Sequence, residues 1–277
     1  MRSRIARAAR SALLLALLVY AGLPFYWMVL TAVRPATELL RVPPPWTPGS
    51  ISFANFVTVW STIPLAHYIL NTLIVALITT LVGVTIAALA AYGLVRYRFR
   101  GSTAILAVVL FTLTIPTVIT LVPFYSLLYQ AGLLNTRIGL ALSYVVWAIP
   151  FTALLLRSYF QTAYSIEVEE AALMDGCSRI SVLWRIMLPL SLPGLISAAV
   201  FTLLLSWNEF IWASVVMTDD SVWPASIGLQ LFVTQLGTTP ELGQWMAGAV
   251  ILTIPLALLF MAVQRYVTAS YGGVIEK

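Results

Sequence analysis

Long apolar runs separated by short charged segments make up the hydrophobic pattern of this chain. The first run, residues 11–33, follows four arginines and contains no Asp, Glu, Lys or Arg. A helix that crosses the ~30 Å hydrocarbon layer of a membrane needs about 20 residues. Comparable runs lie at about 68–95, 102–123, 138–156, 190–217 and 245–264. The pattern predicts an all-α, polytopic membrane protein in which residues 1–277 form a single domain with six transmembrane helices.

The segments around these runs refine the prediction. The first run is longer than the ~7–15 apolar residues of a cleaved signal peptide, so we expect a retained first span. Residues 43–50, PPPWTPGS, cannot continue a helix because of their prolines. Residues 124–136, FYSLLYQAGLLNT, are too few and too polar for a crossing and predict a helix at the membrane interface. Prolines within spans predict kinks at Pro116, Pro123, Pro150 and Pro255.

The composition supports a membrane protein, because 61% of the residues are hydrophobic, against about 45–50% in a soluble domain. The basic residues lie dispersed between the apolar runs, which indicates topology signals rather than a nucleic-acid site. With both termini in the cytoplasm, the outer segments hold only Arg34, Arg41 and Arg137. The inner segments then hold Arg2, Arg4, Arg7, Arg10, Arg96, Arg98, Arg100, Arg157, Arg179, Arg185, Arg265 and Lys277. Cytoplasmic segments are rich in Arg and Lys, so this is the orientation that we expect, with a cytoplasmic tail at 265–277.

Residues 157–189, which we call the charged loop, concentrate charge in a chain with only 9% Asp, Glu, Lys and Arg. Each charge would cost about 2.5–3.5 kcal/mol at the bilayer centre, so the loop must face water or another protein. Gly176 is placed to end one short helix and Ser178 to cap a second. Ile180, Leu183, Trp184 and Met187 would form one apolar stripe on the second helix. Periodicity alone leaves open whether this loop binds another protein or is solvated at the membrane surface.

A signature within the charged loop narrows this choice. The pattern E-A-A, three residues, G, nine residues, I-x-L-P is filled by Glu170, Ala171, Ala172, Gly176, Ile186, Leu188 and Pro189. It resembles the cytoplasmic signature of the permease subunits of ABC importers. Residues 90–101 (AAYGLVRYRFRG), 132–151 (GLLNTRIGLALSYVVWAIPF) and 206–210 (SWNEF) are similar to the carbohydrate-uptake branch, in particular the maltose-type second permease. The tail ASYGGVIEK departs from that branch, which leaves its reach toward the ATPase subunits open.

The resemblance implies a type I ABC importer permease fold in the cell membrane and a transport subunit rather than an enzyme. It implies a companion permease subunit, two ATP-binding-cassette ATPase subunits and an extracytoplasmic solute-binding protein as partners. The charged loop would then dock on an ATPase and tilt spans four and five. The residues that we expect to carry this coupling are Glu169, Glu170, Ala171, Ala172, Asp175, Gly176, Ile186, Leu188 and Pro189. A P-loop needs a lysine after its glycines, and the only lysine is Lys277, so ATP and Mg²⁺ are expected on the partner ATPase.

Four polar or aromatic residues are candidates for lining a solute pathway: Asn71, Trp207, Asn208 and Glu209. For Asn71 a hydrogen bond between helices is an equal alternative. Glu209 lies about 30 Å along the helix from Pro189, which favours an acid at the outer interface over a lining role beside Trp207 and Asn208. His67 is the only histidine, which excludes a zinc site built from several histidines, and we expect Cys177 to have no redox role.

The alternatives to an importer of a sugar or sugar-like solute are of two kinds. An ion-coupled secondary transporter would need paired charges at mid-membrane, and an intramembrane enzyme would need a catalytic motif within a span. Neither pattern is evident in the sequence. Within the ABC class, glycerol phosphates or amino sugars remain possible solutes.

Overall fold

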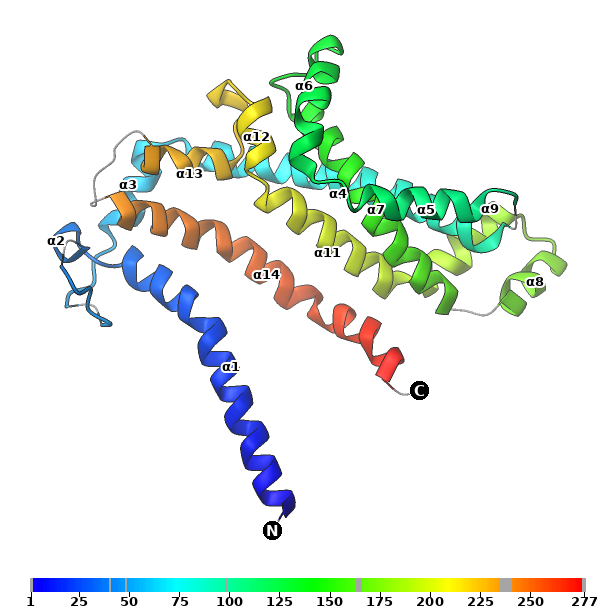
Figure 1. The fold of residues 1–277 in the computed structure, drawn as a ribbon, viewed down its shortest axis with the longest axis horizontal. Coiled ribbons are helices and arrows are strands. Elements are labelled where there is room, and N and C mark those ends of the chain that lie inside the picture. The colour runs from blue at the N-terminus through cyan, green and yellow to red at the C-terminus, as the bar shows by residue number, and fades with distance from the viewer. Residues whose placement is uncertain are drawn as a thin grey trace. The chain divides into compact units, whose positions relative to one another are not determined.

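The computed structural model describes residues 2–39, 41–47, 49–97, 99–162, 166–234 and 241–275, and these contain helices and no strand. They fall into two compact units, residues 1–66 with 228–255 and residues 67–227 with 256–277. Figure 1 labels the helices. In chain order the longer ones are α1 (Arg2–Ala32), α3 (Ala54–Thr62), α4 (Leu65–Arg96), α5 (Ser102–Thr112), α6 (Leu121–Gln130), α7 (Arg137–Thr162), α8 (Ile166–Met174), α11 (Leu192–Asn208), α13 (Ala225–Thr234) and α14 (Glu241–Ile275).

Polar contacts hold the loop after α1 in the first unit. Arg34 is almost fully buried and donates to the carbonyls of Pro45 and Thr47. Glu38, in the short helix α2 (Ala36–Leu39), accepts the backbone N–H groups of Gly49 and Ser50 at 3.1 and 3.0 Å. The described residues of the proline-rich segment, 43–47 and 49–50, therefore form a loop fastened by side chains and no helix, in agreement with the sequence-based expectation.

The core of the second unit lies between α4, α7 and α11. One apolar cluster brings together α4, α7, α11 and the second half of the charged loop; its buried members are Ala87, Ala88, Ala91, Tyr92, Ala153, Leu156, Phe160, Leu183, Met187 and Ala198. The helices α7 and α11 pack along each other (Figure 1). Gly194 of α11 allows this close approach, because a Cβ there would lie 2.5 Å from the ring of Tyr159 on α7; small residues are common between helices in membranes.

Four helices in the described part of the chain are long and apolar enough to cross a membrane: residues 9–32, 65–96, 137–162 and 242–266. Two further candidates are pairs of helices, each bent sharply at a short break. They give six spans if each pair is one span, so the predicted count of six stays a prediction. The first, fourth and sixth predicted runs each form one helix that is longer than the run, because the helices extend into the charged segments.

Span three is not the continuous helix expected for residues 102–123. α5 ends at Thr112, a 3-10 turn follows at Thr117–Thr120, and α6 begins at Leu121, with a bend of 97° between the two parts. Pro116 has no N–H to continue an α-helical ladder, and the preceding amides of Thr114 and Ile115 bond to carbonyls only three residues back. The expected kink is thus a break, and α6 accounts for most of the segment predicted as a separate interfacial helix.

Span five also differs from its predicted limits, 190–217. The chain bends by 78° at Ser191, between α10 (Leu188–Leu190) and α11. The first turn of the long helix therefore contains Pro193, not Pro189. α11 ends at Asn208, and residues 211–216 form a separate short helix, α12 (Ile211–Val216). The predicted limits missed both ends, because the run was taken through Ser191 at one end and through Asn208 and Glu209 at the other.

Candidate functional site

The charged loop contains the bend that its sequence predicts. Its first helix, α8, ends at Met174, and Gly176 follows with φ = +84°. The N–H of Gly176 bonds to the carbonyl of Leu173 at 3.1 Å, and that of Cys177 bonds to Ala172 at 3.0 Å. These two bonds and the left-handed glycine form a Schellman motif, which ends the helix and turns the chain. Ser178 then caps α9 (Arg179–Val182), accepting the N–H of Ser181 at 3.2 Å, as predicted.

The predicted apolar stripe of the second helix is only half correct. Leu183 and Met187 are buried, but Ile180 and Trp184 are 70% and 60% exposed. The five residues Leu183–Met187 form a π-helical turn, which is wider than an α-helical turn and changes the angular spacing of the side chains. The expectation of one continuous face assumed α-helical spacing throughout.

The first helix of the charged loop has an inner and an outer face. Glu169 and Ala172 are buried, whereas Glu170 and Ala171 are exposed. Past the end of the helix, Asp175 and Gly176 are exposed as well. The outer face therefore presents the acids Glu170 and Asp175 together with Ala171 and the strongly exposed Met174, with the chain turning sharply beside them.

Glu169 does not point outward, as a residue that meets another protein would. Its carboxylate forms an ion pair of 2.9 Å with Arg96 at the end of α4, and both side chains are almost fully buried. A second guanidinium, that of Arg179, lies at 3.5 Å, and the hydroxyl of Tyr92 donates at 3.3 Å. Removing one member of a buried ion pair typically costs about 3–5 kcal/mol. These contacts fasten the loop to α4, so Glu169 supports the outer face from within.

Arg96 and Tyr92 are functional candidates that the sequence did not single out. Both lie in the stretch AAYGLVRYRFRG, which was noted only for its resemblance and its inward charge. A buried acid such as Glu169 needs a cation beside it, because an unpaired buried charge is costly. The sequence offers several arginines for that role and does not indicate which one.

The remaining signature residues lie at the start of span five. Leu188 packs against the core cluster, Ile186 is half-buried and Pro189 is exposed. Cys177 is a free, half-buried cysteine. The signature therefore combines exposed positions on α8 with positions that join the loop to α11.

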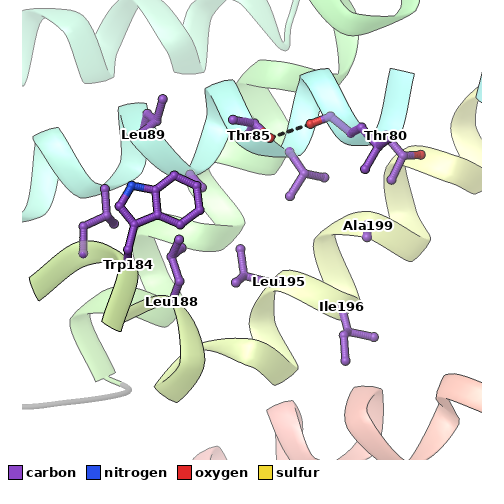
Figure 2. A pocket seen from close by; sticks show the side chains of 12 residues that line it. Thr80, Thr85, Leu89, Trp184, Leu188, Leu195, Ile196 and Ala199 are labelled. Atoms are coloured by element: carbon purple, nitrogen blue, oxygen red, sulfur yellow. Dashed lines mark hydrogen bonds between the residues drawn. The ribbon is translucent and has the colours of Figure 1, made fainter. Parts of the chain in front are cut away.

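An apolar pocket of about 340 Å³ lies where α4, the charged loop and α11 meet. Figure 2 shows Trp184 and Leu188 of the loop facing Leu89 of α4 across it. The hydroxyl of Thr85 is already bonded to the carbonyl of Leu81 at 2.6 Å (Figure 2). None of the described lining residues is charged, so this pocket lacks the convergent polar groups that orient a hydrophilic solute.

Asn71 has structural partners within this chain. Its side chain is fully buried, and its amide donates to the carbonyls of Ser221 and Trp223 at 3.2 and 2.9 Å. Its oxygen accepts from Arg137 Nε at 2.7 Å. These bonds agree with the alternative of a structural hydrogen bond, with Arg137 at the start of α7 and the loop after α12 as partners, and the lining role stays a prediction. His67 lies in the same cluster, 2.6 Å from the carbonyl of Ser221.

Glu209 and its neighbours also have structural partners. Glu209 accepts the N–H groups of Trp212 and Ala213 at 2.8 and 3.0 Å and so caps α12. The indole of Trp207 is buried, and the exposed amide of Asn208 bonds back to Leu204 at 2.9 Å. Of the four predicted lining residues, Asn208 alone is classed as exposed in this chain.

A different pocket combines aromatic and hydroxyl groups. It has a volume of about 260 Å³ and lies at the break of span three. Its described lining is Thr112, Leu113, Ile115, Thr117, Thr120, Phe124, Val146, Trp147 and Pro150. Trp147 stacks edge-on against Trp212 at 4.3 Å, which fixes the ring in place. None of these residues is charged. The sequence does not predict this pocket, because the pocket is formed by the break in span three.

Among the described residues, no group of three His, Cys, Asp or Glu side chains could hold a metal ion.

Comparison with known proteins gives this arrangement a family. Residues 83–272, more than half of the chain, match the family described as "Binding-protein-dependent transport system inner membrane component". The chain belongs to this family. It is therefore a permease subunit of an ABC importer and a multi-pass membrane protein, as its resemblance implied. The matched region contains the charged loop, the broken span three and Glu209.

Two relatives and one solved structure show how far the similarity extends. The permease is 36% identical over 253 residues to a probable ABC transporter permease protein of Bacillus subtilis, YurM, covering 90% of this chain and 81% of the relative. It is 31% identical over 277 residues to the diacetylchitobiose uptake system permease protein NgcG of Streptomyces coelicolor, covering 96% and 91%. A chain in the crystal structure of a bacterial ABC transporter involved in the import of the acidic polysaccharide alginate superimposes with a TM-score of 0.82 at 23% identity, covering 96% of the permease and 98% of that chain.

The solved structure supports the fold of the permease over nearly its whole length. The predicted ABC importer permease fold is thus confirmed, including the helices that lie outside the matched region. The residue-level roles in the charged loop and in the pocket at the break of span three are not part of that comparison. They follow from the geometry of the permease itself.

Proposed function

We propose that this permease forms half of the translocation pathway for a sugar or sugar-like solute, and that the outer face of its charged loop docks on a cytoplasmic ATPase subunit. The observation that carries the proposal is the contrast on α8. Glu170, Ala171, Asp175 and Gly176 are exposed, while Glu169 beside them is buried in an ion pair. A solvated loop at the membrane surface would not need the support of a buried ion pair, whereas a surface that binds a partner needs it to keep its shape.

The proposed partner supplies the nucleotide chemistry. ATP and Mg²⁺ are bound by the ATPase, because a P-loop lysine is needed at the phosphates and the sequence has no internal lysine. The complete importer would contain a companion permease, two ATPase subunits and an extracytoplasmic solute-binding protein. Both termini lie in the cytoplasm in this proposal, because the arginines then gather on the inner side and the charged loop faces the ATPases.

The pocket at the break of span three is the proposed solute-facing part of this subunit. Sugars offer hydroxyl groups for hydrogen bonds and apolar faces for aromatic contact, and the pocket has threonines beside Phe124 and Trp147. Its described lining has no cation to balance a phosphate, which favours a neutral sugar over a glycerol phosphate. One relative, NgcG of Streptomyces coelicolor, is a diacetylchitobiose uptake permease, which is consistent with a carbohydrate as the solute.

The decisive experiment is purification of the permease from cells that express the complete importer. We expect an ATPase to copurify and uptake into proteoliposomes to require ATP. Glu170→Lys should release the ATPase and abolish uptake, while membrane insertion stays normal. Asp220→Lys is the matched control, since it reverses an exposed charge in the loop between α12 and α13.

Two results would contradict the proposal. One is Glu170→Lys with a normal amount of bound ATPase and normal uptake. The other is uptake by the permease alone, driven by an ion gradient without ATP, which would make it a secondary transporter. Competition by unlabelled sugars, amino sugars and glycerol phosphates then identifies the class of solute.

A further inference from the structure

The charged loop is connected covalently to only two spans. It follows α7 and precedes α11, so movement of the loop reaches these helices through the backbone. α4 is distant in sequence and can follow the loop only through side-chain contacts. Its packing against the loop is therefore decisive for whether it moves together with α7 and α11.

Apolar contacts between α4 and the charged loop resist sliding of one along the other only weakly. On the α4 side the core cluster presents Ala87, Ala88 and Ala91 to Leu183 and Met187 of the loop. A row of methyl groups packs closely but resists sliding poorly, as in shear motions of packed helices. Next to it lies the apolar pocket of Figure 2, where Trp184 and Leu89 leave space unfilled.

Polar contacts at the end of α4 are directional. The Nε of Arg96 lies 2.9 Å from Oε2 of Glu169, and the two side chains are 7% and 4% exposed. Tyr92, one turn earlier on α4, donates to the other carboxylate oxygen. In so dry a site, separation of the two charges would be costly, because water could not replace the lost partner.

We propose that the Arg96–Glu169 ion pair is the link by which α4 follows the charged loop, which makes Arg96 and Glu169 positioning residues for transport. The inference rests on the proposed docking of an ATPase on this loop. ATPase closure would displace the loop, and α4 would move with α7 and α11 as one body. Without the link, ATP would still be hydrolysed, but α4 would lag and solute would not be carried.

The two cations of Glu169 allow a selective test. Arg96→Met removes the cation on α4 and keeps an apolar stem, while Glu169 retains Arg179. Arg179→Met removes the half-exposed cation on the loop itself, which also lies over the ring of Tyr97 at 5.4 Å, and leaves the Arg96–Glu169 pair, so it is the matched control for that pair. Arg96→Lys keeps the charge and should rescue. The complete importer is reconstituted in proteoliposomes with its ATPase and binding protein, and solute uptake per ATP hydrolysed is measured.

We expect Arg96→Met to retain ATPase binding, because Glu169 still pairs with Arg179 within the loop, but to lower uptake per ATP about tenfold, a size typical of coupling between sites. Arg96→Lys and Arg179→Met should stay within about twofold of the unchanged importer. Spin labels at Leu81 of α4 and Leu142 of α7, in a Cys177→Ser background, give a second readout. The distance between the two labels should stay the same on addition of ATP when Arg96 is present. In Arg96→Met the distance should change on addition of ATP.

Normal uptake per ATP and an unchanged label distance in Arg96→Met would overturn the link. If Arg96→Met does not insert, Glu169→Gln is used instead, because it keeps the shape and removes the charge; full coupling in that variant would overturn the link equally. Failure of the ATPase to copurify with the unchanged permease would instead reject the docking proposal, so the two failures are distinguishable.

Discussion

The hydroxyl of Tyr144 donates a hydrogen bond of 2.6 Å to the carboxylate of Glu209, joining the middle of α7 to the end of α11. The same carboxylate caps α12 through two backbone N–H groups. One acid thus fixes three helices of the second unit relative to each other. An acid in this position is favoured by the helix dipole at the start of α12.

Replacing Glu209 should therefore destabilise the fold. We expect Glu209→Gln to lower the free energy of unfolding by about 1–3 kcal/mol, because charge-assisted hydrogen bonds are lost. Tyr144→Phe should cost about 1 kcal/mol. Thermal unfolding in detergent measures both, and the double variant should lose less than the sum because the two side chains share one bond. Strict additivity would contradict the coupling.

Asn71 should be as sensitive as a core residue. Asn71→Leu is close in volume but leaves Arg137 and the carbonyls of Ser221 and Trp223 without their partner. We expect a loss of about 2–4 kcal/mol in stability, since buried polar groups without partners are costly. Solute affinity measured on the surviving fraction should be unchanged. A large change in affinity with normal stability would instead restore Asn71 to the pathway.

Gly176 should tolerate asparagine but not valine. A Cβ at this position would meet no atom within 4 Å, so the only obstacle is the positive φ of 84°. A left-handed residue costs roughly 1–2 kcal/mol, more for a β-branched side chain, while asparagine adopts this region readily. We expect Gly176→Val to reduce ATPase binding and uptake strongly and Gly176→Asn to retain most of both. Equal loss in the two variants would show that no side chain of any kind is tolerated at this position.

Acid should loosen the loop after α1 through Glu38. Hydrogen bonds from Gly49 and Ser50 lower the pKa of Glu38 below its ordinary value of 4.5. A depressed pKa means that the contribution to stability is present above the ordinary value and is lost as the pH falls through the folded-state pKa. Hydrogen exchange of residues 49–52 should rise as the pH falls below about 4.5, beyond the intrinsic change. The Glu38→Gln variant should lack this pH dependence, and identical profiles would contradict the role of Glu38.

Trp147 should affect solute binding. Trp147→Leu removes the aromatic face of the pocket at the break of span three, and one aromatic contact contributes about 0.5–1.5 kcal/mol. The apparent KM for the solute should rise about 2–10-fold. Trp184→Leu, which alters the apolar pocket instead, should leave KM unchanged. Unchanged KM in Trp147→Leu would place the solute elsewhere.

Much of the fold could be predicted because the membrane imposes simple rules on sequence. The long apolar runs around Leu81 and Ala148 form helices because each run is long enough to cross and lacks charge. Gly176 and Ser178 were correctly identified, since helix ends are determined by local backbone chemistry. The positions of these features needed no knowledge of distant contacts.

The errors have a different physical origin. The partner of Glu169 depends on which arginine the fold brings near, and residues 96 and 169 are far apart in sequence. Asn71 and Glu209 were candidates for a pathway, with a structural hydrogen bond and an interfacial position as their alternatives. Their partners, the carbonyls of Ser221 and Trp223 for Asn71 and the start of α12 with Tyr144 for Glu209, are set by the fold. The break at Pro116 was expected as a kink, because a proline alone does not reveal whether the next helix resumes its direction.

That break limits what can surround the permease in the bilayer. Residues 112–119 are exposed in this chain and do not form a continuous helix. Lipid tails offer no hydrogen bonds to irregular backbone, so they cannot coat this segment. Wherever this break lies within the hydrocarbon layer, a neighbouring subunit or a hydrated lumen must therefore adjoin it, and the annulus of lipid around the assembled importer would be interrupted there.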